Sequence, residues 1–136
     1  MPAANTTIQT SGKRKAAVAR AVITKGSGRV WVNSRPIEVW EPYEARLKMQ
    51  EPILISGARA EGLDISITVT GGGYMGQASA VRTAIARGLI EAFRDNELAS
   101  VFKHYDRSLL VNDTRRKLPK TPQGRGARKR RQKSYR

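Results

Sequence analysis

The chain has 136 residues, with 26 Lys and Arg against 11 Asp and Glu and a formal net charge of +15. This length favours one domain with an attached segment, and this charge favours nucleic acid as a partner. The absence of Cys excludes disulfides, thiolate metal sites and thiol nucleophiles. No apolar run approaches the ~20 residues of a membrane span, and residues 1–10 carry no signal-peptide pattern. We therefore expect a cytoplasmic protein.

Alternating apolar and polar residues in the first 40 positions predict strands. Ile8 is a candidate start for the first strand, and Gly12–Lys15 predicts a basic loop. Residues 16–24 follow a period of two, which predicts a strand. Residues 29–33 repeat the alternation after a glycine-containing turn, so we expect these two strands to pair as a hairpin.

A helix is predicted to begin at Glu41–Pro42, because proline suits the first helical position. Pro52 predicts a kink or a division of this helix. Its predicted apolar stripe consists of Tyr43, Leu47, Ile53 and Leu54. The clearest strand of the chain follows at Leu63–Thr70, where apolar residues alternate strictly with polar ones.

Two helices are predicted in the last part of the body. Met75–Arg94 has an apolar stripe at helical spacing, with Arg87 on its wet face. Asn96 is a candidate cap for a shorter helix ending at Tyr105, and residues 109–111 predict an extended anchor. This order of elements predicts an α+β two-layer sandwich, with about four strands and helices on one face.

The glycine loop, Gly71–Gly76, allows three interpretations. Its spacing matches a dinucleotide-binding pattern, but a hairpin precedes it and no carboxylate ends a second strand downstream, so we expect no cofactor. The second interpretation is a tight turn with positive φ angles. The third is an RNA contact, because glycines allow close approach and the next helix presents free N–H groups. Its candidate residues are Gly72, Gly73, Tyr74 and Gln77.

No catalytic or metal site is predicted. His104 is the only His, and no Cys or clustered carboxylate accompanies it, so we expect a protein that is not an enzyme. Trp31 and Trp40 are interpreted as core or sheet-edge residues, with base stacking as the alternative.

The segment Thr114–Arg136 contains eleven Lys and Arg and no acidic residue. Its prolines and glycines interrupt any regular element, so residues 1–113 are predicted to form a globular body and residues 114–136 a disordered basic tail. Such a charge density suits a phosphate backbone, although a solvated tail, a localisation signal or a DNA-compacting protein remain alternatives. The candidate RNA-binding cations are Lys13, Arg14, Lys15, Arg115, Arg116, Lys117, Lys120, Arg125, Arg128, Lys129, Arg130 and Arg131.

Four blocks of sequence carry a resemblance to a known family: GKRKAAVARA, GGGYMGQASAVRTAIARGL, YDRSLLVNDTRR and GRGARKRRQKSYR. In this order, from Gly12 to Arg136, they resemble the family of the ninth protein of the small ribosomal subunit. The closing Lys-Ser-Tyr-Arg is similar to the archaeal and eukaryotic form, whereas bacterial members tend to end in Ser-Lys-Arg.

The resemblance implies a fold similar to the second domain of the fifth small-subunit protein. It implies a place in the head of the small subunit, on the 3′ domain of the small-subunit rRNA and beside neighbouring head proteins, without cofactor or small-molecule substrate. It also implies that the tail reaches the peptidyl-tRNA site, where Arg136 contacts the anticodon stem-loop backbone and Lys133 and Tyr135 assist. Because Tyr135 replaces a bacterial Lys, stacking or a hydroxyl bond is expected there instead of a charge contact.

Overall fold

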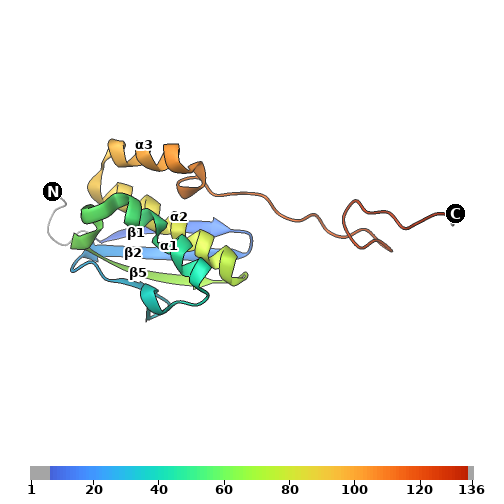
Figure 1. Cartoon of the computed structure of the whole chain (residues 1–136), viewed down its shortest axis with the longest axis horizontal. Coiled ribbons are helices and arrows are strands. Elements are labelled where there is room, and N and C mark those ends of the chain that lie inside the picture. The colour runs from blue at the N-terminus through green and yellow to red at the C-terminus, as the bar shows by residue number, and fades with distance from the viewer. Residues whose placement is uncertain (1–6, 135–136) are drawn as a thin grey trace.

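A computed structural model describes residues 7–134 as a five-stranded sheet with helices on one face and an extended C-terminal segment (Figure 1). The strands are β1 (Ile8–Arg14), β2 (Ala17–Lys25), β3 (Val30–Val32), β4 (Arg35–Pro36) and β5 (Leu63–Thr70). The helices are α1 (Tyr43–Ser56), α2 (Tyr74–Phe93) and α3 (Asn96–Tyr105). Short 3-10 turns occupy Ile37–Val39, Gly57–Gly62 and Arg107–Leu109. The predicted α+β two-layer architecture is confirmed, with five strands instead of about four.

The sheet has the order β1-β2-β5-β3-β4, so the predicted hairpin between residues 16–24 and 29–33 is wrong. β5 lies between these two segments, antiparallel to β2 and parallel to β3. The Asp64 carboxylate of β5 accepts hydrogen bonds from the Arg29 and Ser27 backbone N–H groups at 3.0 and 2.8 Å. These bonds lower the pKa of Asp64 and hold the connecting loop across the end of β5.

The long hairpin of this sheet is β1–β2, which closes through the two residues between Arg14 and Ala17. Lys15 takes a left-handed conformation in this turn, with φ of 54°. The predicted basic loop Gly12–Lys15 is therefore wrong for its first three residues, which belong to β1. The consequence is that Lys13 and Arg14 are held on a strand instead of a mobile loop.

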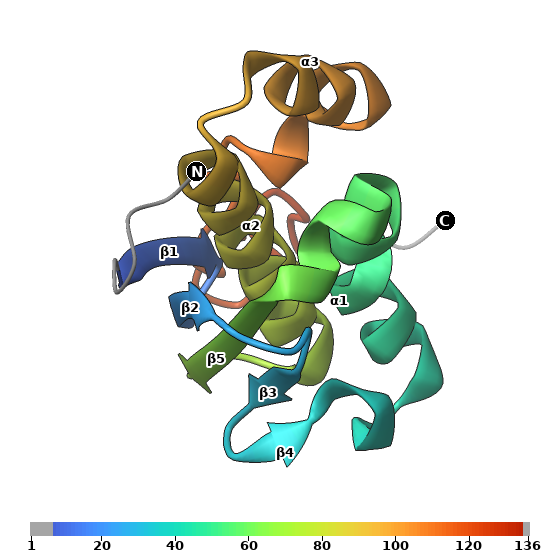
Figure 2. The same ribbon diagram turned by 90° about the vertical axis from the view of Figure 1, so that its left-hand side faces the viewer.

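The core lies between the sheet and α2, which crosses β1 and β2 (Figure 2). Ala17, Ala19 and Ala21 of β2 are fully buried, and their small side chains allow the helix to approach closely. The strand Leu63–Thr70 is confirmed, and the predicted helix Met75–Arg94 is confirmed to within one residue at each end. Among the described residues, no helix is long and apolar enough to cross a membrane.

The predicted apolar stripe of α1 is wrong for three of its four residues; only Ile53 packs against the core. Ala45, Met49 and Pro52 form its buried face, whereas Tyr43, Leu47 and Leu54 are exposed. The sequence pattern favoured the larger side chains, but the close packing of α1 on α2 selects the face with a small and a flexible residue. The helix also continues through Pro52 without being divided.

Two boundaries near the end of the body also differ from prediction. The cap of α3 is Asp95 and not Asn96, since its carboxylate accepts a hydrogen bond from the Glu97 N–H at 2.8 Å. The predicted extended anchor at residues 109–111 is wrong, because a 3-10 turn at Arg107–Leu109 takes its place. Leu109 is nevertheless fully buried and anchors the end of the body.

Candidate nucleic-acid interface

Three separately predicted segments meet at one end of the body: the β1–β2 turn, the glycine loop and the start of the tail. The Lys13 N–H donates to Asn112 Oδ1 at 3.2 Å, and Arg14 Nη1 donates to the Arg115 carbonyl at 2.9 Å. On the other side of the turn, a Cβ added at Gly71 would lie 2.4 Å from the Ala16 carbonyl oxygen. Segments that are far apart in the sequence thus form one surface, and most of its charge is positive.

Asp113 organises the start of the tail. Its carboxylate accepts bidentate hydrogen bonds from the Arg115 guanidinium, with Nη2 to Oδ2 at 2.8 Å. It also forms an ion pair with Arg14 at 3.4 Å. The Arg115 side chain and backbone hold the pKa of Asp113 well below its usual range. Arg116 Nη2 donates to the Lys15 carbonyl at 2.7 Å. Asp113 therefore offsets much of the charge of Arg14 and Arg115, but not that of Lys15, which is exposed.

A buried arginine fixes the segment that leads into the tail. Arg82 of α2 contacts Glu51 at 2.5 Å, Asp106 at 2.9 Å and the Ser108 hydroxyl at 3.1 Å. A buried guanidinium is tolerated only when it is paired in this way. Burial tends to raise the pKa of Asp106, but hydrogen bonds from Ser108 and Arg82 outweigh this and lower it.

Arg87 also bridges two segments, through hydrogen bonds to backbone carbonyls. Its Nε donates to the Leu110 carbonyl at 2.8 Å and its Nη1 to the Ser11 carbonyl at 2.7 Å. The prediction that Arg87 lies on the wet face is therefore wrong, since it is half-buried between the end of the body and β1. Sequence reasoning did not single out Arg82, although an arginine beside a buried helix stripe is itself a signal for a carboxylate partner.

A polar hollow of about 370 Å³ lies between these anchors. Its hydroxyl groups come from Ser79, Thr83 and Ser108, and its carboxylates from Asp106 and Asp113. Cations outnumber carboxylates around it, which suits a bound phosphate oxygen. The cations that line it are Lys13, Arg14, Lys48, Arg82 and Arg115.

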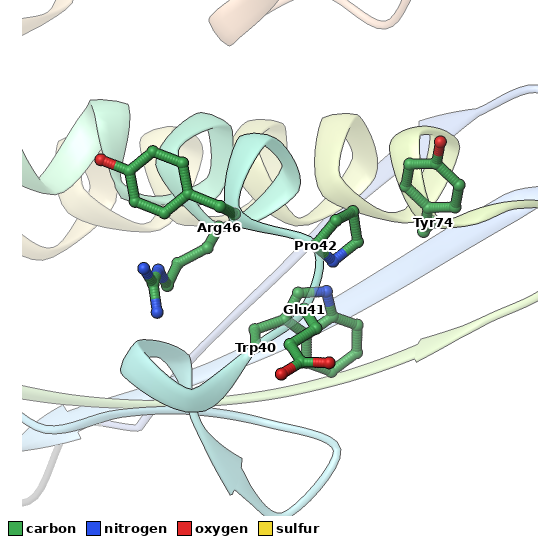
Figure 3. A pocket seen from close by; sticks show the side chains of 6 residues that line it. Trp40, Glu41, Pro42, Arg46 and Tyr74 are labelled. Carbon is green, nitrogen blue, oxygen red and sulfur yellow. The ribbon is translucent and has the colours of Figure 1, made fainter.

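The glycine loop is confirmed as a tight turn. Gly71 and Gly72 have φ of 77° and 67°, a conformation that side chains disfavour, and Gly73 precedes the first turn of α2. The Gln77 amide donates to the Gly71 carbonyl at 3.2 Å and closes the loop on itself. Tyr74 does not line the polar hollow but lines a separate one with Trp40 and Pro42 (Figure 3). An RNA contact by this loop stays a prediction.

The tail contains no helix or strand between residues 114 and 134 and extends away from the body (Figure 1). One turn interrupts it, where the Gly124 N–H donates to the Thr121 carbonyl at 3.1 Å. Its cations from Arg116 to Lys133 are exposed and form no ion pair with any residue between 7 and 134. Tyr135 and Arg136 lie outside the described residues, and disorder of the free tail stays a prediction.

His104 is exposed on α3. Within residues 7–134, no group of three or more His, Cys, Asp or Glu side chains is placed to hold a metal ion. The candidate site is thus the cationic end of the body together with the tail, a construction typical of proteins that accompany RNA.

Comparison with known proteins identifies the family. Residues 12–136 match the family model described as ribosomal protein S9/S16. The chain is 59% identical to the small ribosomal subunit protein uS9 of Halobacterium salinarum, over 93% of this chain and 97% of the relative. It is 53% identical to the uS9 protein of Thermoplasma volcanium, over 93% and 96%. The chain belongs to the S9 family of ribosomal proteins, and the predicted family and its archaeal type are confirmed.

Proposed function

We propose that this chain is a structural component of the cytoplasmic small ribosomal subunit, and that it binds the small-subunit rRNA through its cationic end and its tail. The observation that carries the proposal is the convergence of Lys13, Lys15 and Arg116 at the origin of the tail, where Arg116 donates to the Lys15 carbonyl. Cations held at fixed positions on a folded body give a phosphate backbone a defined orientation. The tail then extends the contact along the RNA.

We also propose the wider setting that the resemblance implies. We place the chain in the head of the subunit, on the 3′ domain of the rRNA and next to other head proteins. The alternative of a DNA-compacting protein is not favoured, because the family model covers residues 12–136, including all of the basic tail. Sedimentation with small subunits after a high-salt wash would separate the two functions.

The cationic end is tested by neutralising two exposed lysines of the β1–β2 turn. The double variant Lys13→Gln and Lys15→Gln is expected to flatten the log–log salt dependence of rRNA binding by about 1.5 units, since each phosphate contact contributes about 0.7–0.9. Filter binding to a head fragment of the rRNA across a salt series measures this slope. The control is Lys25→Gln with Lys103→Gln, which removes the same charge from the far end of β2 and from α3. Equal slopes for both variants would contradict the proposed interface.

We further propose that the end of the tail contacts peptidyl-site tRNA. A terminal Arg136 presents its guanidinium to a phosphate through two parallel bonds, and such a contact serves every tRNA alike because it reads backbone instead of bases. The extended course of residues 114–134 away from the body supports this reach. Lys133 and Tyr135 are close enough in sequence to assist.

Deleting Arg136 alone is expected to leave subunit assembly intact and to weaken tRNA in the peptidyl site up to about tenfold. A charge-assisted bond contributes roughly 1.5–3 kcal/mol, and the wet tip and the terminal carboxylate reduce this value. Filter binding of tRNA to reconstituted subunits at low Mg²⁺ measures the change, with sedimentation as the assembly control. Arg136→Lys keeps the charge and loses the two-pronged geometry, so it should fall between wild type and the deletion. Wild-type affinity after deletion would leave the tail as an rRNA anchor only.

A further inference from the structure

The strongest feature outside the cationic end is an open groove of about 680 Å³ where α1 and α2 begin (Figure 3). It is lined by residues just before and at the start of α1 and by one at the start of α2: Trp40, Glu41, Pro42, Tyr43, Arg46 and Tyr74. Aromatic rings and a proline in one groove are typical of sites that bind extended chains.

The groove belongs to a face with unusually exposed apolar side chains. Tyr43 and Tyr74 of the groove each have 58% of their surface exposed, and Val39, just before Trp40, has 66%. Leu47 and Leu54, which follow Tyr43 on the same face of α1 by helical spacing, are 40% and 71% exposed. The face of α1 that was predicted to be buried is therefore the one presented to solvent. Large apolar side chains gathered on one face mark a surface that a partner covers.

Three carboxylates lie close together in the segment that forms the groove and the start of α1. Glu38, Glu41 and Glu44 are exposed, and none of them forms an ion pair with a described residue. Arg46 offsets them only in part: its Nη1 donates to the Glu38 carbonyl at 2.5 Å and its guanidinium lies 4.9 Å from the centre of the Tyr43 ring. Carboxylates at this spacing repel a phosphate backbone, so RNA is the wrong occupant for this face.

We propose that the groove and the acidic apolar face beside it dock a basic, extended segment of a neighbouring protein. Arg46 over Tyr43 shows the stacking geometry within the chain itself, and the rings of Trp40 and Tyr74 offer further faces to an incoming guanidinium. Glu38, Glu41 and Glu44 supply the complementary charge, and Val39 and Leu47 the apolar area. This proposal rests on the proposed function for its setting, and it gives Tyr74 a protein partner instead of the predicted RNA contact.

The first test uses the free protein, so it does not depend on the ribosome. In a Trp31→Phe background Trp40 is the sole tryptophan, and its fluorescence reports the groove directly. Titration with an octa-arginine peptide is expected to change this fluorescence, and the triple variant Glu38→Gln, Glu41→Gln, Glu44→Gln should weaken binding at least fivefold. The matched control, Glu61→Gln, Glu91→Gln, Glu97→Gln, removes the same charge from exposed positions elsewhere and should bind as wild type. Equal weakening by both triples, or no fluorescence change, would overturn the proposal.

The second test places the groove in the assembled subunit. A photo-crosslinking phenylalanine at Tyr43 should cross-link to a Lys- and Arg-rich peptide of another protein, identified by mass spectrometry, and the Glu38, Glu41, Glu44 triple should reduce that product while the control triple does not. Cross-links to rRNA alone, or to nothing, would reject the docking site. Failure of the protein to sediment with subunits would instead count against the proposed function, and the fluorescence titration would then decide the docking site alone.

Discussion

Removal of residues 117–136 is expected to lower the salt slope of rRNA binding by several units and to leave the body folded. The segment carries nine Lys and Arg, and each phosphate contact contributes about 0.7–0.9 to the slope. A salt slope that is lower by several units corresponds to an rRNA affinity that is lower by orders of magnitude at low salt. The cut is placed after Arg116 because this residue still hydrogen-bonds the Lys15 carbonyl.

The body should keep its stability because the tail buries nothing in it. All residues from Lys117 to Gln123 are exposed, whereas the core is closed by Leu109 and Phe102. Filter binding across 50–200 mM salt measures the slope, and urea unfolding measures the stability of the body. A full-length variant with the Lys and Arg of 117–131 changed to Gln keeps the chain length and should behave like the truncation. An unchanged slope would mean that the cationic end alone carries the electrostatics.

The strands and helices with the longest regular patterns were predictable, but their neighbours were not. Leu63–Thr70 and Met75–Arg94 were predicted almost to the residue. In each segment the apolar residues recur at a regular spacing, every second residue in the strand and every three or four in the helix. The alternation of residues 16–24 indicates which face is buried and not which strand lies beside it. The insertion of β5 between β2 and β3 is a long-range event, and only Asp64 hints at it through its bonds to the loop at Ser27 and Arg29.

The candidate site was likewise predictable only in part. The lack of helix and strand between residues 114 and 134 was predictable, since prolines, glycines and closely spaced charges favour no regular element. Lys13 and Arg115 were each identified by their charge, but their proximity depends on Asn112 and Asp113, about 100 residues from the turn that they contact. The buried role of Arg82 was missed because its partners, Glu51 and Asp106, lie on two other elements.

Gly12→Ala is expected to destabilise the body strongly, although it adds a single methyl group. Gly12 lies on β1 directly beneath α2, where an added Cβ would lie 2.1 Å from the Ala80 carbonyl oxygen and 2.8 Å from the Ala84 nitrogen. These are backbone atoms of a helix, so no side-chain rotation relieves the overlap. β1 and α2 must separate, and the fully buried Ala80 and Ala84 lose their contacts. Overpacking of this kind costs about 3 kcal/mol.

The separation of β1 from α2 would also disturb the cationic end of the body. Lys13 follows Gly12 on β1, and its N–H holds Asn112 at the origin of the tail. Gly12→Ala should therefore lower the urea midpoint and also weaken rRNA binding, whereas Gly62→Ala, with nothing within 4 Å of the new Cβ, should change the stability by less than about 1 kcal/mol. Equal midpoints for the two variants would show that β1 and α2 do not pack this closely. A lower midpoint with unchanged rRNA binding would show that the cationic end tolerates movement of the strand that carries it.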